Sequence, residues 1–206
     1  LRRKIDQFLT DWKTRKDHKP LIVSGSRQIG KTTSIKEFGN TYKSFIEINF
    51  KTEPKFQDIF SSGYTVDEII KTISLLKNNT NFIPNDTLIF FDEIQEYPDA
   101  LTSFKSFCLD GRFDVIASGS LLGINYKKIS SIPVGFKEEY KMNSLDFEEF
   151  LWGKGYKDEQ IDDIFTYLKE VKQLPDSLFK QLDSLFTEYL FVGGLPESVS
   201  SFIQTN

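Results

Sequence analysis

The chain has 206 residues, of which 39% are hydrophobic and 27% charged, a balance typical of globular proteins with a core large enough to fold without disulfides. Its 26 basic and 30 acidic residues give a formal net charge of -4, so no overall positive field draws the chain onto nucleic acid. One cysteine, Cys108, excludes an internal disulfide and a zinc site built from cysteines, and one histidine, His18, excludes a metal site of three histidines.

The single cysteine also predicts a reducing, cytoplasmic environment. No hydrophobic run approaches the roughly 18 residues of a membrane span, and the first residues lack the pattern of a signal peptide, so we expect neither membrane insertion nor secretion. The only methionine is Met142, and the sequence stops within an amphipathic stretch. We therefore expect a fragment of a longer protein.

Strands and helices alternate in the first part of the chain. Apolar residues at helical spacing predict a first helix that carries Ile5, Phe8, Leu9 and Trp12. The next predicted elements are a strand at 21–23, a helix ending at 39–40, a strand at 45–50, a helix behind a capping box at 65–68, a strand at 88–91, a helix at 101–108 and a strand at 113–117. This alternation predicts a parallel sheet that is covered on both faces.

The pattern changes after residue 143, because no further strand is predicted there. Asp146 is the expected cap of a helix that runs through residue 152, and two more helices are predicted at 161–171 and 178–189. Pro196 is expected at the first position of a last helix. The sequence thus predicts an α/β core with an N-terminal helix at residues 1–143, and a small helical lid or the start of a C-terminal region at residues 144–206.

A glycine-rich motif connects the strand at 21–23 to the next helix. Residues 25–32 read Gly-Ser-Arg-Gln-Ile-Gly-Lys-Thr and match the pattern G-x-x-x-x-G-K-[ST] of phosphate-binding loops. Glycines let backbone N–H groups curl around phosphate oxygens, and the start of the helix adds a partial positive charge. We expect Lys31 to bridge the β- and γ-phosphates and the Thr32 hydroxyl to complete the shell of a magnesium ion.

The candidate nucleotide-binding residues include the whole motif and the residue after it. They are Gly25, Ser26, Arg27, Gln28, Ile29, Gly30, Lys31, Thr32 and Thr33. The side chain of Thr33 is expected on the helix surface or in the core. Arg27 is expected either at a solvated loop tip or in contact with a neighbour or with the helical region.

The apolar strand at 88–91 delivers two carboxylates, Asp92 and Glu93, at its C-terminal end. Doubly wound parallel sheets bind their ligands at this edge. Asp92 is therefore the expected magnesium ligand, and Glu93 is expected to orient or polarise the attacking water. We interpret the nearby Gln95 and Glu96 as exposed polar residues.

The strand at 113–117 runs into two small hydroxyl residues, Ser118 and Ser120. If this strand lies beside the one that carries Asp92, either serine reaches the γ-phosphate, and the pattern does not decide between them. The alternative is a Ser-Gly turn without a function. With this pair included, the candidate catalytic residues are Lys31, Glu93, Ser118 and Ser120.

Few arginines are available to act as an arginine finger, which stabilises the negative charge of the transition state of phosphoryl transfer. They are Arg2, Arg3, Arg15, Arg27 and Arg112. Arg112 precedes the strand at 113–117 and is the best placed to reach a second copy of the chain. Surface solubility explains this residue equally well.

Five stretches of the sequence resemble the AAA-type P-loop ATPases of bacteria and archaea that carry a C-terminal domain of unknown function. These stretches are residues 25–33, 91–95, 118–123, 145–151 and 189–197. The Arg-Gln pair within the loop, Phe-Glu-Glu-Phe-Leu at 147–151 and Gly-Gly-Leu-Pro-Glu at 193–197 make the resemblance specific. An arginine that related proteins often carry after the sensing strand is absent, because residues 133–137 read Pro-Val-Gly-Phe-Lys.

The resemblance implies a P-loop NTPase sandwich of three layers with a parallel central sheet, followed by a helical lid. It implies ATP and Mg²⁺ as ligands, with Lys31 and Thr32 on the phosphates and the metal. It further implies that Asp92 and Glu93 are the acidic pair of the site. Residues 118–120 would then form the end of the strand that senses the nucleotide.

Two functions fit these residues. The first is Mg-dependent binding and hydrolysis of ATP, with the nucleotide state coupled to movement of the lid or of a partner. The second is a nucleotide-gated binding or regulatory module with negligible turnover, which acts on nucleic acid or protein through a missing C-terminal domain. A GTPase is disfavoured because no Asn-Lys-x-Asp segment is present. Nucleic-acid binding rests only on the basic run within residues 2–19, and such runs are usually solvated faces.

Overall fold

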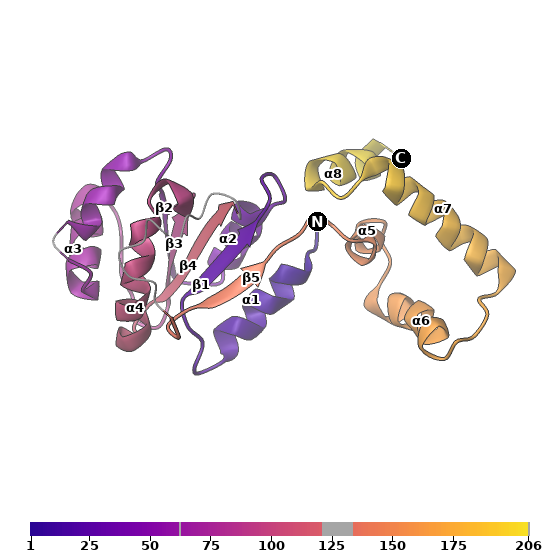
Figure 1. Ribbon diagram of the computed structural model, residues 1–206, viewed down its shortest axis with the longest axis horizontal. Helices are drawn as coiled ribbons and strands as arrows, with labels where there is room; N and C mark the ends of the chain where they lie inside the picture. The colour runs from indigo at the N-terminus through magenta and orange to yellow at the C-terminus, as the bar shows by residue number, and fades with distance from the viewer. Residues whose placement is uncertain (62, 121–133, 206) are drawn as a thin grey trace. The chain divides into compact units, whose positions relative to one another are not determined.

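The computed structural model describes residues 1–61, 63–120 and 134–205 (Figure 1). The chain forms two compact units. One unit is Phe8–Met142, and the other combines Leu1–Gln7 with Asn143–Asn206.

The first unit is built on a five-stranded sheet. Its strands are β1 (Leu21–Gly25), β2 (Ser44–Asn49), β3 (Thr87–Asp92), β4 (Asp114–Ser120) and β5 (Glu138–Lys141). They lie in the order β2-β3-β4-β1-β5, and each neighbouring pair is parallel. Helices lie on both sides of this sheet, so the predicted α/β sandwich of the P-loop NTPase type is confirmed (Figure 1).

Four α-helices accompany these strands in the sequence. They are α1 (Lys4–Thr14), which begins in the residues of the second unit, α2 (Lys31–Gly39), α3 (Val66–Leu76) and α4 (Phe104–Asp110). Three shorter helical turns are η1 (Pro54–Phe60), η2 (Ile94–Glu96) and η3 (Pro98–Ser103). The helix expected at 101–108 begins later, at Phe104, and ends at Asp110, where Gly111 is the C-cap in a left-handed conformation with φ 69°.

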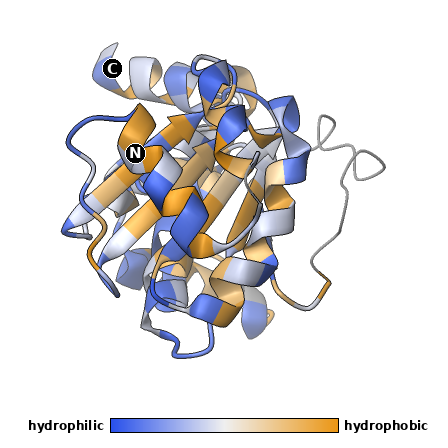
Figure 2. Ribbon diagram, turned by 90° about the vertical axis from the view of Figure 1, so that its left-hand side faces the viewer, coloured by the Kyte–Doolittle hydropathy of each residue, from blue (hydrophilic) through white to orange (hydrophobic). Residues whose placement is uncertain are grey.

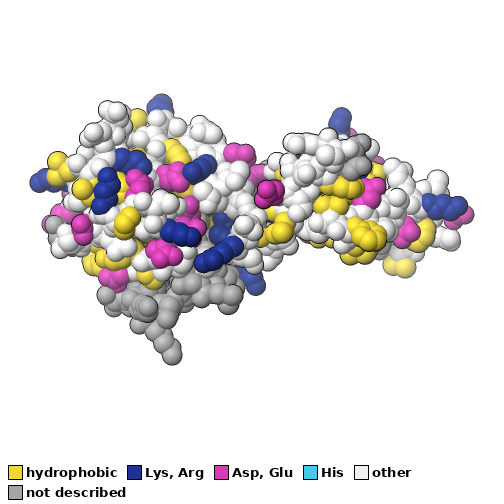
Figure 3. Space-filling view, turned by 90° about the horizontal axis from the view of Figure 1, so that it is seen from above, with side chains coloured by type: hydrophobic (Ala, Val, Ile, Leu, Met, Phe, Trp, Pro, Cys, Tyr) yellow, Lys and Arg dark blue, Asp and Glu magenta, His cyan; other side chains and the backbone are white. Residues whose placement is uncertain are grey.

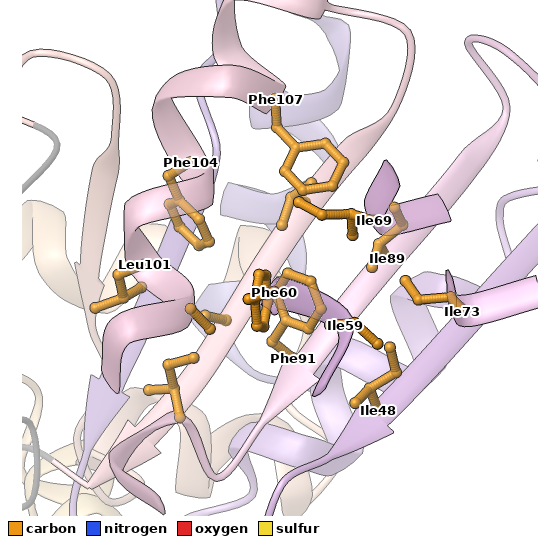
Figure 4. Close-up of a cluster of buried hydrophobic side chains, with 14 of the residues drawn as sticks. Ile48, Ile59, Phe60, Ile69, Ile73, Ile89, Phe91, Leu101, Phe104 and Phe107 are labelled. Atoms are coloured by element: carbon orange, nitrogen blue, oxygen red, sulfur yellow. The ribbon is translucent and has the colours of Figure 1, made fainter. Parts of the chain in front are cut away.

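Aromatic and branched side chains form the core on one face of the sheet (Figure 4). Phe91 of β3 is fully buried and stacks on Phe50, while Phe60 packs against the edge of its ring. Every residue of β3 is buried, as expected for a central strand with helices on both faces. Hydrophobic stretches can be seen along strands of the sheet in Figure 2.

The role expected of Ser118 and Ser120 requires β4 to lie beside the strand that carries Asp92, and it does. Leu88 lies opposite Asp114 and Phe91 opposite Ala117, so β4 pairs directly with the strand that carries Asp92. On its other edge β4 pairs with β1, and Ser120 lies opposite Gly25. Consequently the C-terminal ends of β1, β3 and β4 meet at one edge of the sheet.

One strand was missed, and one local expectation was wrong. The strand β5 was not predicted, although it pairs with β1 from Leu21 to Ser24. The capping box at 65–68 does not form, because Thr65 makes no side-chain hydrogen bond to the helix backbone. Its hydroxyl instead donates to the Glu68 carboxylate over 2.5 Å.

The second unit consists of helices α5 (Phe147–Gly153), α6 (Asp158–Lys169), α7 (Asp176–Val192) and α8 (Pro196–Thr205) with the first residues of the chain. Pro196 begins α8, as predicted. Asp146 caps α5 in a capping box with Glu149, in which each side chain accepts from the other residue's backbone N–H. The helix predicted at 161–171 begins earlier and ends at Lys169, and Val171 beyond it is 92% exposed.

The two stretches that resemble the family in this region, 145–151 and 189–197, meet in space. The backbone N–H of Leu145 donates to the carbonyl of Gly194 over 2.8 Å. A Cβ at Gly194 would lie 2.4 Å from the Leu145 carbonyl oxygen, so no larger residue fits there without a shift. Tyr189 closes the same turn by donating from its hydroxyl to the Leu145 carbonyl over 2.9 Å. These stretches therefore hold the helical unit together.

A buried ion pair fastens the start of the chain to α5. The Arg3 guanidinium lies 3.1 Å from the Glu149 carboxylate, and both side chains are almost fully buried. The same carboxylate accepts from the backbone N–H of Lys4 over 2.7 Å, and Arg3 also donates to the carbonyl of Asn143. Glu149 thus serves both as part of the helix cap and as the partner of the N-terminal segment.

Candidate functional site

The phosphate loop runs from the end of β1 to the start of α2. Ser26, Arg27 and Gln28 are exposed, whereas Ile29 is buried and fixes the loop to the core. Gln28 has φ 62° and Gly30 has φ 93°, so the chain turns through two left-handed residues before α2 begins at Lys31. This conformation brings the free N–H groups of the first helical turn to the end of the sheet.

Gly25 is required at its position by close packing. A Cβ there would lie 2.3 Å from the carbonyl oxygen of Met142 and 2.6 Å from the Cδ1 atom of Ile29. Met142 follows β5 directly, and its N–H donates to the carbonyl of Ser24 over 2.8 Å. The first glycine of the motif therefore packs against the last residue of the sheet-containing unit.

The Lys31 side chain folds back over the loop. Its ammonium group donates to the carbonyl of Gly25 over 3.1 Å and to that of Ser26 over 2.6 Å. Burial lowers the pKa of Lys31, and the charge of Arg27 acts in the same direction, whereas the carboxylates of Glu93 and Asp92 oppose the shift. The nearby carboxylates compensate the charge of this half-buried ammonium group only in part. An anion bound in the loop would supply further negative charge.

Asp92 ends β3 and is 4% exposed. Its carboxylate accepts hydrogen bonds from the Thr32 hydroxyl at 3.1 Å, the Asn49 amide at 3.2 Å, the Glu93 N–H at 3.0 Å and the hydroxyl of Ser118. The donors come from α2, β2, β4 and the residue that follows β3, so one carboxylate connects the end of β3 to three other elements. Asn49 was not among the predicted residues, and it reaches Asp92 because the two lie opposite each other in the sheet.

Glu93 leaves the strand in a left-handed conformation, with φ 53° and ψ 45°. A non-glycine residue rarely adopts this conformation, and it turns the side chain away from the line of the strand. The Glu93 carboxylate accepts a hydrogen bond from the Gln95 amide. The Gln95 oxygen in turn accepts from the N–H of Ser120 over 3.1 Å. Gln95 was expected to be an exposed polar residue, and that interpretation was wrong because its side chain is partly buried between β3 and β4.

The two candidate serines occupy different places. Ser118 is 1% exposed and its hydroxyl is held by Asp92. Ser120 is partly exposed at the end of β4, beside the first glycine of the phosphate loop. Ser118 is thus a donor to the acidic residue, and Ser120 is the serine at the mouth of the loop. The remainder of the resembling stretch, 121–123, lies outside the described residues.

Thr32 lies within the cluster, since its hydroxyl points at Asp92, whereas Thr33 is exposed on the surface of α2. Thr33 can offer its backbone N–H to a ligand, but its side chain lies outside the cluster around Asp92. The structure therefore brings together the side chains of Lys31, Thr32, Asp92 and Glu93 with both serines, which come from three segments: the start of α2, the end of β3 with the residue after it, and the end of β4.

The arginine candidate for a finger is already paired within the described chain. Arg112 makes ion pairs with Asp67 at 2.6 Å and with Asp110 at 2.7 Å. It precedes β4, so it lies at the opposite end of this strand from Ser120.

The basic run at the start of the chain is largely neutralised by acidic partners. Arg2 pairs with Asp158, Arg3 with Glu149, Lys4 with Asp146 and Glu148, and Arg15 with Glu138. Basic and acidic side chains are interspersed on the face that Figure 3 shows. A surface of mixed sign does not favour a polyanion such as nucleic acid.

No helix in the described ranges is both long and apolar enough to cross a membrane. Within the same ranges, no group of three or more His, Cys, Asp or Glu side chains is arranged to hold a metal ion. The side-chain oxygens of Asp92 and Thr32, which lie 3.1 Å apart, could hold a metal here.

Comparison with known proteins bears on this arrangement. One solved structure that matches is that of the Walker-type ATPase paby2304 of Pyrococcus abyssi, with 14% identity and a TM-score of 0.46. The match covers 98% of this chain and 66% of the length of that protein. A search of curated proteins found no match. The family model described as an AAA domain matches residues 17–151, which include both the phosphate loop and the acidic pair. The chain therefore belongs to the AAA domain family of P-loop ATPases.

Proposed function

We propose that this chain binds ATP together with Mg²⁺ and hydrolyses its terminal phosphate. The observation that carries the proposal is the meeting of Thr32 and Asp92, whose side-chain oxygens lie 3.1 Å apart although the residues are 60 positions apart in sequence. Membership of the AAA domain family supports nucleotide binding in general. The residues around this pair supply the specific chemistry.

The triphosphate binds to the loop at residues 25–33. Backbone N–H groups of the first turn of α2 donate to its oxygens, and Lys31 exchanges the carbonyls of Gly25 and Ser26 for the β- and γ-phosphates. A phosphate is a stronger partner for an ammonium group than a neutral carbonyl is, because the hydrogen bond joins opposite charges. The lysine is therefore held close to its ligand before the ligand arrives.

The donor set fits Mg²⁺, which prefers oxygen ligands and keeps several waters. Thr32 and Asp92 direct oxygens at one another, and these two side chains would hold the cation. When bound, Mg²⁺ neutralises charge that develops on the phosphate oxygens during transfer. Asn49 and Ser118 hold the Asp92 carboxylate in a fixed direction for this role.

Glu93 is the residue proposed to orient the attacking water and accept its proton. It follows the metal ligand directly, and its left-handed backbone directs its side chain differently from that of Asp92. Two adjacent carboxylates can therefore serve the metal and the water separately. Ser120 lies at the mouth of the loop, where its hydroxyl is placed to contact the γ-phosphate.

We further propose that the nucleotide state is transmitted to the helical unit through Met142. This residue packs its carbonyl against Gly25 of the loop, and the next residue, Asn143, is bound by Arg3 within the helical unit. A shift of the phosphate loop on ligand binding thus acts on the backbone that leads into the helices. Slower deuterium exchange of α5 in the presence of Mg-ATP supports this coupling, and unchanged exchange there contradicts it.

Release of phosphate from ATP, measured with Mg²⁺ and with EDTA, tests the proposal. We expect Mg-dependent turnover by the unaltered chain, its loss in Glu93→Gln with ATP still bound, and loss of both binding and turnover in Lys31→Ala. Measurement across protein concentrations shows whether a second copy of the chain contributes, because the specific rate then rises with concentration. Tight binding of ATP without turnover would favour a nucleotide-gated binding module instead, and undiminished turnover in Glu93→Gln would refute the role of that residue.

A further inference from the structure

The side chain of Gln95 connects two strands at the candidate site. It lies in η2, the short turn that follows β3, and its amide group spans from the Glu93 carboxylate to the backbone of Ser120 in β4. Ser120 lies opposite Gly25 of the phosphate loop in the pairing of β4 with β1. One continuous path of contacts therefore runs from Glu93 through Gln95 and Ser120 to the loop.

The chemistry at each end fixes which way the Gln95 amide faces. The Ser120 N–H is a donor, so it requires the amide oxygen, whereas the Glu93 carboxylate only accepts, so it requires the amide nitrogen. Turning the amide over would set donor against donor and acceptor against acceptor. Glu93 is thus held by a group that is itself anchored to the neighbouring strand.

We propose that Gln95 is a positioning residue, which sets the direction of the Glu93 carboxylate and ties it to the strand end beside the phosphate loop. This inference rests on the proposed function, because it assigns Gln95 an effect through the residue that orients the water. Glu93 needs such support, because it is partly exposed and leaves β3 in a left-handed conformation, with φ 53°. A free glutamate side chain there would sample many directions. Small errors in the placement of a reacting group cost large factors in rate.

Two substitutions at Gln95 distinguish its hydrogen bond to Glu93 from its hydrogen bond to Ser120. Gln95→Glu keeps an oxygen to accept from Ser120 but loses the donor to Glu93 and places a second carboxylate against it. Gln95→Met keeps the length of the side chain and loses both bonds. The control is Glu96→Gln, an exposed neighbour in the same turn. If Gln95 acts through Glu93, both Gln95 variants should lower kcat about 10- to 100-fold, with the Kd for Mg-ATP changed less than about twofold and the control unchanged.

Thermal unfolding of each variant shows whether the fold persists. If Gln95→Met unfolds at a lower temperature than the unaltered chain, Gln95→Glu, which retains the bond to Ser120, decides the outcome.

The results discriminate between this inference and the function on which it rests. Full kcat in Gln95→Glu, while Glu93→Gln is inactive, overturns the role of Gln95 and leaves the proposed function standing. An equal loss of affinity and kcat in Gln95→Glu also overturns it, because that pattern marks a binding role. Absence of turnover in the unaltered chain overturns the proposed function and this inference with it.

Discussion

Replacing Thr32 by valine removes one oxygen from the candidate magnesium site while keeping the shape of the side chain. In the structure the Thr32 hydroxyl donates to Asp92 over 3.1 Å, and the same carboxylate oxygen retains the Asn49 amide at 3.2 Å as a second donor. The fold should therefore lose one hydrogen bond of several, about 1 kcal/mol of unfolding free energy. The larger effect is expected on the binding of nucleotide with metal.

The magnitude follows from what the hydroxyl does in each state. With Mg²⁺ bound, its oxygen is a ligand to a charged group, and an interaction of this kind contributes about 1.5 to 3 kcal/mol. The affinity for Mg-ATP should accordingly fall about 10- to 150-fold, since every 1.4 kcal/mol corresponds to a factor of ten. The affinity for ATP in EDTA should barely change, because the hydroxyl then has no metal to bind.

Isothermal titration calorimetry of Thr32→Val with ATP, in Mg²⁺ and in EDTA, measures both quantities. The matched control is Thr14→Val, which removes an exposed hydroxyl that donates to the carbonyl of Asp11 at the end of α1. Equal losses of affinity with and without Mg²⁺ would refute the reasoning, because they would show that Thr32 contacts the phosphates and not the metal. An unchanged affinity in Mg²⁺ would refute it as well.

Two further predictions concern stability. Arg3→Met leaves the buried Glu149 carboxylate without its ionic partner. The free energy of opening of α5, measured by deuterium exchange of its amides, should therefore fall by about 3 kcal/mol. Arg2→Met, in the exposed pair with Asp158, should change this opening free energy by less than about 1 kcal/mol. Similar effects of the two variants would contradict the importance of burial. The hydrogen bond to Asp114 raises the pKa of His18 in the folded chain. Its stabilising contribution is therefore complete below the unfolded pKa of about 6.5 and is lost as pH rises through the folded pKa. Urea titrations should show that His18→Gln lowers the unfolding free energy more at about pH 5.5 than at about pH 9, and an equal loss at both values would contradict this sign.

The sheet could be predicted because its central strands carry their own signal. Residues 88–91 are all apolar and were expected in a strand buried on both faces, and the structure buries every residue of β3. The alternation with helices then implied parallel pairing, so the C-terminal ends of the strands had to share an edge. Motif and fold together were sufficient to indicate that Lys31 and Asp92 belong to one site.

The strand β5 gave no comparable signal. Its four residues, Glu138–Lys141, include three charged side chains, and it lies at the edge of the sheet with a single neighbour. It is held by backbone hydrogen bonds to β1, and by the Glu138 carboxylate, which accepts from the N–H of Lys19 and pairs with Arg15. These contacts join segments more than 100 residues apart, and no local pattern records them.

The roles of Gln95 and Asn49 also depend on distant pairing. A glutamine after an acidic pair has the composition of an exposed turn, and only the adjacency of β3 and β4 places the Ser120 N–H within its reach. Asn49 reaches Asp92 because β2 and β3 are in register at their last residues. The buried pair of Arg3 and Glu149 likewise joins the two chain segments that form the helical unit. Sequence spacing indicated the candidate residues Lys31, Thr32, Asp92 and Glu93, whereas the contacts of Gln95 and Asn49 with them emerged only from the sheet order.

The central claim is that the loop before α2 and the acid at the end of β3 bind one Mg-nucleotide between them. Calorimetric titration of the unaltered chain with ATP in Mg²⁺, beside Lys31→Met and Asp92→Asn, tests it most directly. The account predicts saturable binding of one ATP per chain, a loss of at least about tenfold in affinity for each variant, and a loss for Asp92→Asn that disappears in EDTA. Absence of binding by the unaltered chain, or equal affinity in all three proteins, would contradict it.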